Sequence, residues 1–161
     1  MSLQQEKIGV FVDVQNIYYT TRDAFGRPFN YRALWKNLSD KGDIVIANAY
    51  AIDRNDESQR KFQSALRHIG FDVMLKPYIQ RADGSAKGDW DVGITVDVLE
   101  KAHALDRVFL LSGDGDFDRL VEAVQTRYGV PVEAYGVPKL TADSLKRTVS
   151  TFHPITESLL I

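Results

Sequence analysis

Acidic side chains follow two apolar segments of the chain at the points where each segment ends. Residues 8–12 form an uninterrupted apolar run, and Asp13 comes directly after it. Residues 108–111 form a second such run, which leads straight into a segment with Asp114 and Asp116. In an open parallel α/β sheet, ligands bind outside the carboxyl ends of the strands. If the two runs are neighbouring strands, we expect these carboxylates to lie close together.

A third acidic group, KGDWD, precedes a segment with helical periodicity. Asp89 is suited to cap the amino end of that helix, which leaves Asp91 without a capping role. Asp97 lies almost two turns further along among apolar residues, where a carboxylate is costly to bury unless it is paired or bound to a metal. Because clustered carboxylates repel one another, three or four of them need a cation to balance their charge. Hard oxygen ligands select Mg²⁺ or Mn²⁺.

A centre of this kind would serve phosphodiester hydrolysis. Such ions keep waters and a substrate phosphate in their shell, activate a water nucleophile and stabilise the leaving oxygen. A simpler interpretation stays open, in which the segment SGDGDF is only a tight turn followed by a capped helix, because Ser, Gly and Asp are ordinary turn residues.

Length and composition narrow the alternatives. The 161 residues fit a single domain covering residues 1–161. The absence of cysteine excludes disulfides, zinc–thiolate sites and thiol catalysis. No apolar run approaches the roughly 18 residues of a membrane span, and the amino-terminal segment does not have the pattern of a secretory signal, so we expect a cytoplasmic protein. A net charge of −2 predicts that any binding of nucleic acid is local or mediated by metal.

Apolar runs with strand character alternate with helical periodicity, which predicts a parallel sheet covered by helices. Strands are expected at residues 8–12, 44–52, 71–75, 108–111 and 130–135. Helical stripes are expected at Tyr31, Leu34, Trp35 and Leu38; at Phe62, Ala65, Leu66 and Ile69; at Val92, Val96, Leu99 and His103; at Phe117, Leu120, Val121, Val124 and Tyr128; and at Leu145, Val149 and Phe152. Residues 20–30 and 80–88 are the most loop-like segments, and the second is a candidate flap near the site.

Three segments in this order resemble the signature segments of a known family: FVDVQNIYY, KGDWDVGITVD and LLSGDGDFDRLV. They are similar to the NYN domain, in its LabA-like branch of the PIN-like nuclease superfamily, and the likeness runs from about residue 8 to the last helix. The resemblance implies a three-layer, Rossmann-like α/β fold whose central parallel sheet has the strand order 3-2-1-4-5. It also implies metal-dependent cleavage of RNA. Taken with the oxygen ligands above and the aromatic residues below, we expect a ribonuclease that depends on Mg²⁺ or Mn²⁺ and cleaves single-stranded RNA.

The resemblance implies a role for each matching side chain. The catalytic residues, which would also bind the metal directly or through water, are Asp13, Asp91, Asp114 and Asp116. The supporting residues are Asn16, Ser112, Asp97 and Asp118. Asn16 and Ser112 would hold carboxylates in place by hydrogen bonds, and Asp97 matches the second acid that the family carries on its helix. Lys87 would neutralise a phosphate, with an ordinary surface lysine as the alternative.

Aromatic and basic side chains gather just after the first acidic motif. Aromatic rings stack on unpaired bases while Arg and Lys follow the backbone, a pattern suited to single strands. The preferred substrate contacts are Arg22, Phe25 and Arg27. Tyr31 and Trp35 belong to a helical stripe and are expected in the core.

Other functions fit the sequence less well. A haloacid-dehalogenase-type phosphatase needs a second Asp where Gln15 stands, and a topoisomerase-primase-type fold expects a glutamate after the first strand. An RNA-binding or regulatory protein with little catalysis remains the non-enzymatic alternative. A homodimer, which would give more surface on which to grip a strand, also stays open.

Overall fold

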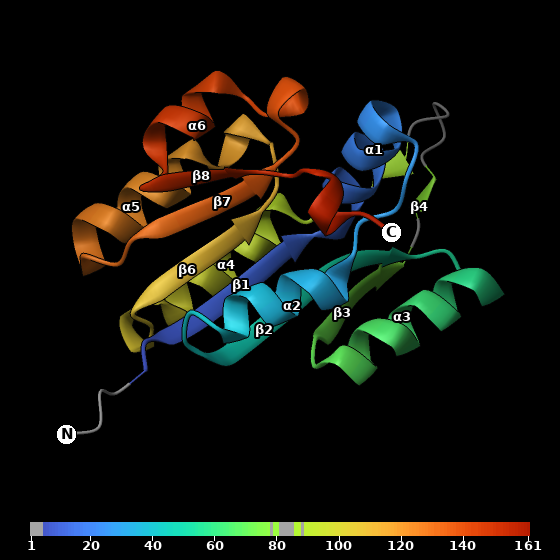
Figure 1. Cartoon of the computed structure of the whole chain (residues 1–161), viewed down its shortest axis with the longest axis horizontal. Helices are drawn as coiled ribbons and strands as arrows, with labels where there is room; N and C mark the ends of the chain where they lie inside the picture. The colour runs from blue at the N-terminus through green and yellow to red at the C-terminus, as the bar shows by residue number, and fades with distance from the viewer. Residues whose placement is uncertain (1–4, 78, 81–85, 88) are drawn as a thin grey trace.

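One sheet of parallel strands forms the centre of the molecule, in the order β3-β2-β1-β6-β7-β8 (Figure 1). The computed structural model describes residues 5–77, 79–80, 86–87 and 89–161, and of residues 79–80 and 86–87 it describes the backbone alone. The strands are β1 (Lys7–Asp13), β2 (Asp43–Asp53), β3 (Asp72–Pro77), β6 (Arg107–Leu111), β7 (Val132–Gly136) and β8 (Thr151–Pro154). Outside this sheet, β4 (Ile79–Gln80) pairs antiparallel with β5 (Ala86–Lys87).

Helices connect the strands and cover both faces of the sheet. They are α1 (Val14–Phe25), α2 (Tyr31–Ser39), α3 (Glu57–Ile69), α4 (Asp91–Lys101), α5 (Asp118–Tyr128) and α6 (Asp143–Thr148). Short 3₁₀ turns lie at η1 (Ala102–Ala104), η2 (Gly115–Phe117), η3 (Pro138–Leu140) and η4 (Glu157–Leu159). The α/β class and the parallel sheet predicted from the alternating pattern are confirmed.

The sheet divides the hydrophobic core into two layers, and its central strand β1 contributes side chains to both. Its side chains alternate between the faces, so that Val10 and Val12 pack with Leu34 of α2, whereas Phe11 packs with Ile94 of α4. Figure 1 shows α2 in front of the sheet and α4 behind it. Because β1 is buried on both faces, it reads in the sequence as a continuous apolar run.

The predicted five-strand order is correct but incomplete, because β8 adds a sixth strand. The expected last helix ends at Thr148, and Phe152 lies in β8 opposite Ala134 of β7. A strand of four residues is at the lower limit of length at which an alternating pattern can be recognised. Pairing with β7 therefore decides its conformation.

Two further expectations are corrected by the structure. Residues 20–30 are not all loop, because α1 continues to Phe25 and stops only at Gly26, which adopts the left-handed conformation (φ 64°) that favours glycine. On α4, Val92 and Val96 are 73% and 46% exposed, while Ile94 and Val98 are buried instead. That helix is apolar on two sides, so its periodicity did not identify the side that docks. The predicted flap at residues 80–88 lies largely outside the described residues.

In the part of the chain that the structure describes, no helix has both the length and the apolar character needed to cross a membrane.

Candidate metal centre

The carboxyl ends of β1 and β6 lie side by side, as the two acidic motifs predicted. Val12 pairs with Leu111, so the next residues, Asp13 and Ser112, are neighbours across the strands. The Ser112 hydroxyl donates to Asp13 Oδ2 at 3.1 Å. Asp13 Oδ1 accepts the Asn16 amide at 3.3 Å and so caps the amino end of α1. Both oxygens of this buried carboxylate are therefore hydrogen bonded.

Further hydrogen bonds fix the loop that follows β6. The hydroxyl oxygen of Ser112 accepts the Asp114 amide at 3.2 Å, and the side-chain oxygen of Asn16 accepts the Gly113 amide at 2.9 Å. Asp114 Oδ1 in turn accepts the Asp116 amide at 2.9 Å. Ser112 and the Asn16 side chain therefore hold the loop that carries two of the acids, and Ser112 also bonds the Asp13 carboxylate directly.

Packing underneath keeps this loop in place. Phe117 has no exposed surface and belongs to the core on the α4 face. A Cβ at Gly113 would lie 2.8 Å from the Leu140 carbonyl oxygen, so only glycine allows the loop to approach the backbone before α6 so closely. The Ala142 amide donates to the Gly113 carbonyl at 3.0 Å. Gly113 is therefore required for the close packing of this loop against the backbone before α6.

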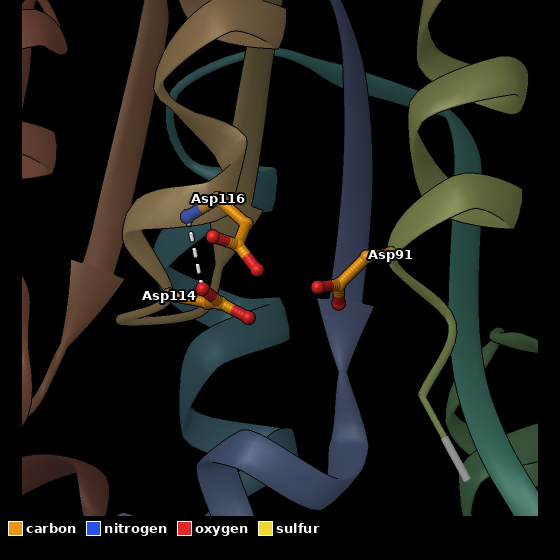
Figure 2. Close-up of side chains that lie close together, drawn as sticks. All are labelled: Asp91, Asp114 and Asp116. Carbon is orange, nitrogen blue, oxygen red and sulfur yellow. Dashed lines mark hydrogen bonds between the residues drawn. The ribbon is translucent and has the colours of Figure 1, made fainter. Parts of the chain in front are cut away.

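Asp91 reaches the same place from the first turn of α4. Figure 2 shows its carboxylate turned toward those of Asp114 and Asp116, which come from the loop after β6. One oxygen from each of the three residues lies within 4.8 Å of the other two. Among the side chains that the structure describes, no basic residue forms an ion pair with any of these three acids. The cluster thus concentrates negative charge.

Two acids of the site have raised pKa values, chiefly because they are removed from water. Burial, reinforced by the charge of Asp114 and by a hydrogen bond between the two carboxyl groups, raises the pKa of Asp91 to about 7. Burial likewise raises the pKa of Asp13 to about 6, although the hydrogen bonds from Asn16 and Ser112 partly oppose this shift. Acids that share a site and lack a balancing charge hold protons more tightly than usual.

These residues fit a hard divalent cation. Three carboxylates with oxygens within 4.8 Å of one another supply the ligand type that Mg²⁺ and Mn²⁺ prefer. A bound cation would also relieve the repulsion that raises the pKa of Asp91. Asp13 is not part of this trio, and its two oxygens accept hydrogen bonds from Asn16 and Ser112. Its role as a ligand, directly or through water, remains a prediction.

The other supporting acids lie in different surroundings. Asp97 does not join the trio, and its Oδ2 accepts the Tyr50 hydroxyl at 2.8 Å. Asp118 starts α5, and its Oδ1 is buried with no hydrogen-bond partner among the described residues.

The predicted substrate contacts on α1 are exposed. The Arg22 guanidinium lies over the rings of Tyr18 and Tyr19, at 5.4 and 4.9 Å from their centroids, and also lies 3.6 Å from Asp23. Phe25 is exposed, whereas Arg27 donates to the carbonyl of Ile161 at 2.9 Å. Arg27 therefore has a structural contact of its own. The Lys87 side chain lies outside the described residues.

Two aromatic residues beside the site were not expected from the sequence. Tyr50, in β2, is paired in register with Asp13, and Trp90 directly precedes Asp91. Their rings lie 5.2 Å apart. The proximity of Trp90 to the KGDWD motif was a signal for one of them, whereas Tyr50 sits within an apolar run that gave no such signal.

Comparison with protein families matches residues 7–156 to the NYN domain. The chain belongs to the NYN domain family. This assignment confirms the resemblance found in the three signature segments and places the chain in the PIN-like nuclease superfamily. The NYN chain is 27% identical over 135 residues to the low amplitude and bright protein LabA of Synechococcus elongatus. The aligned region covers 79% of this chain and 72% of LabA.

A solved structure has the same fold as this NYN chain. It is the crystal structure of a protein of unknown function from Vibrio parahaemolyticus, which is 52% identical in sequence and superimposes with a TM-score of 0.94. The match covers 100% of this chain and 99% of the Vibrio protein. The fold therefore recurs over its full length in a relative whose function is not known.

Proposed function

We propose that this NYN protein is a ribonuclease that depends on Mg²⁺ or Mn²⁺ and hydrolyses phosphodiester bonds of single-stranded RNA. The observation that carries the proposal is the trio Asp91, Asp114 and Asp116, whose oxygens gather within 4.8 Å at the edge of the sheet where ligands of α/β folds bind. Membership of a family in the PIN-like nuclease superfamily supports it.

Each acid has a part that follows from its position. Asp91, Asp114 and Asp116 would hold the cation, and Asp13, fixed by Ser112 and Asn16, would orient its water shell. A bound Mg²⁺ or Mn²⁺ supplies an activated water and stabilises negative charge on the phosphate and the leaving oxygen. The protein contributes a fixed set of carboxylates, so that little rearrangement is needed when the substrate arrives.

The face of α1 beyond Asn16 supports a single-stranded substrate. Tyr18 and Tyr19 are 55% and 36% exposed, and exposed rings can stack on unpaired bases. Arg22, which lies over both rings, would contact the phosphate backbone, with Phe25 and Lys87 as further proposed contacts. A duplex would not offer free base faces to such a surface.

Cleavage of end-labelled RNA tests the proposal. Single-stranded RNA and DNA are incubated with Mn²⁺, Mg²⁺ or EDTA, and the wild type is compared with Asp13→Asn and Asp114→Asn. Metal-dependent cleavage of RNA that both substitutions abolish is the expected result. Asp40→Asn, which alters an exposed acid at the end of α2 outside the trio, is the matched control and should cleave like the wild type.

Two outcomes would overturn the proposal. Cleavage that persists in EDTA or in both variants would exclude the assigned centre. Binding of RNA without any cleavage would favour the alternative, an RNA-binding regulatory protein that keeps the acidic cluster. Binding through phosphates would weaken steeply as salt is added.

A further inference from the structure

Two contacts tie the amino-terminal part of α4 to strand β2. The indole N–H of Trp90 donates to the Ala51 carbonyl at 2.9 Å, and the Tyr50 hydroxyl donates to Asp97 Oδ2 at 2.8 Å. Trp90 comes directly before Asp91, the first residue of α4, and Asp97 follows six residues later. The two contacts therefore bracket the segment of helix that presents Asp91 to the other acids.

Tyr50 is built into the sheet beside the site. It pairs in register with Asp13 across β1 and β2, and almost none of its surface is exposed. Its hydroxyl accepts the Asn48 side-chain amide at 3.0 Å, which orients its own proton toward Asp97. Burial raises the pKa of Tyr50 above its ordinary range, so this hydroxyl stays a donor. A hydrogen bond to a carboxylate is among the stronger ones in a protein, and this one is partly shielded from water.

Packing around Trp90 shows the same docking. Its ring lies 5.2 Å from that of Tyr50, and the Lys76 ammonium lies 4.5 Å from its centroid. A Cβ at Gly93 would come within 2.5 Å of the indole, so a glycine in the first turn of α4 makes room for the ring. Glycine weakens a helix by about 1 kcal/mol relative to alanine, and close packing of Trp90 is the benefit that offsets this cost.

Asp91 needs such support because its neighbours repel it. It faces Asp114 and Asp116 within 4.8 Å. The N-cap residue of α4 is Trp90, whose side chain makes no capping hydrogen bond to the helix. Its amide donates to Asp89 Oδ1 at 3.3 Å, but Asp89 is itself acidic and exposed. The contacts with β2 thus hold the helix against like charge.

We propose that Tyr50 and Asp97 are positioning residues, which hold Asp91 at the metal centre through the hydrogen bond between the Tyr50 hydroxyl and the Asp97 carboxylate. Asp97 acts as an acceptor for Tyr50 and not as a metal ligand. The inference rests on the proposed function, since it concerns the same centre, and it names the contact through which Asp97, implied by the family resemblance as a supporting residue, would act.

The inference is tested by measuring the Mn²⁺ affinity of the whole protein in the absence of RNA. The electron paramagnetic resonance signal of free Mn²⁺ gives this affinity. The variants are Tyr50→Phe, Asp97→Ala, Asp97→Asn and the double variant Tyr50→Phe/Asp97→Ala. Tyr50→Phe and Asp97→Ala are each expected to weaken Mn²⁺ binding roughly tenfold, the usual effect of losing a group that orients a ligand. The double variant should be no weaker than either single one, because both remove the same hydrogen bond.

Asp97→Asn distinguishes the two roles of Asp97. An asparagine oxygen still accepts the Tyr50 hydroxyl, so a positioning residue keeps near wild-type affinity, whereas a metal ligand loses its charge and its affinity. Tyr135→Phe, which alters another buried tyrosine, is the matched control and should bind Mn²⁺ normally. Thermal unfolding of each variant in EDTA checks the fold. If Asp97→Ala does not fold, the two single variants Tyr50→Phe and Asp97→Asn still distinguish a positioning residue from a metal ligand.

The outcomes separate this inference from the proposed function. If Asp97→Asn binds Mn²⁺ as weakly as Asp97→Ala, if Tyr50→Phe binds normally, or if the single effects multiply to roughly a hundredfold in the double variant, the positioning role is wrong. A wild type that binds Mn²⁺ but cleaves no RNA would end the ribonuclease proposal alone, and weakened binding in Tyr50→Phe would still support the inference. A wild type that binds no Mn²⁺ would overturn both.

Discussion

The two sides of the acidic cluster are held in different ways. On the β1–β6 side, Asp13, Ser112 and Asp114 are joined directly by hydrogen bonds, and the pairing of two central strands fixes their spacing. On the α4 side, Asp91 is supported from a distance, by Trp90 and by the bond between Tyr50 and Asp97. The first side is therefore preformed by sheet register, whereas the second depends on how well one helix docks.

Removing a carboxylate from either side is expected to have the largest effect. Asp91→Asn and Asp114→Asn should each reduce metal-dependent RNA cleavage at least about a hundredfold, since even the residues that orient metal ligands cost up to that much. Because its ionised form is disfavoured in the fold, replacing Asp91 should raise the unfolding temperature in EDTA at about pH 8. An unfolding temperature below that of the wild type would contradict this expectation.

Loss of Ser112 should damage the preformed side more than Tyr50→Phe damages the docked side. Ser112→Ala removes a donor to Asp13 and an acceptor for the Asp114 amide, in a place with no access to water. We expect Mn²⁺ affinity to fall roughly 10–100-fold and the free energy of unfolding to fall by about 1–3 kcal/mol. Ser64→Ala, at an exposed position on α3, is the control. Equal effects of Ser112→Ala and Tyr50→Phe would remove the distinction between the two sides.

Stability should depend on pH through Asp13. Its pKa is raised from 3.8 to about 6 in the fold, so the folded state keeps a proton that the unfolded state has lost, and stability falls as pH rises through this window. Between about pH 4.5 and about pH 7.5, the free energy of unfolding of the wild type should fall by about 2 kcal/mol more than that of Asp13→Asn. Urea unfolding in EDTA measures both. Parallel pH profiles would show that Asp13 is not shifted.

The smallest effect is expected outside both sides, on the exposed face of α1. Arg22→Ala and Tyr18→Ala should raise KM for single-stranded RNA about fivefold, a loss of roughly 1 kcal/mol for one stacking or phosphate contact, while Mn²⁺ affinity stays unchanged. Tyr128→Ala, at an exposed tyrosine that ends α5, should leave KM as it was. A change in Mn²⁺ affinity in Arg22→Ala would mean that the exposed face of α1 acts on the metal centre and not on the RNA alone.

The amino-acid sequence was sufficient to place the acids at the ends of β1 and β6. Apolar runs that end in Asp13 and in the Ser112 loop mark buried parallel strands, because such strands are covered on both faces. The same local signals predicted the helices α2, α3 and α5 and the glycine that ends each of the last two. The KGDWD segment marked Asp91 as an acid without a capping role, and the family resemblance supplied the order of five strands of the sheet.

Only the tertiary structure decided which face of α4 is buried and what Asp97 contacts. Val92 and Val96 are as apolar as Ile94 and Val98, so periodicity alone could not show which of the two pairs is buried. Ile94 and Val98 are buried because they pack with Phe11 and Tyr50. Tyr50 and Asp97 are 47 residues apart in the chain. Strand β8 forms by pairing in parallel with β7 at the edge of the sheet. Contacts between distant segments depend on how helices and strands pack, which local sequence patterns do not encode.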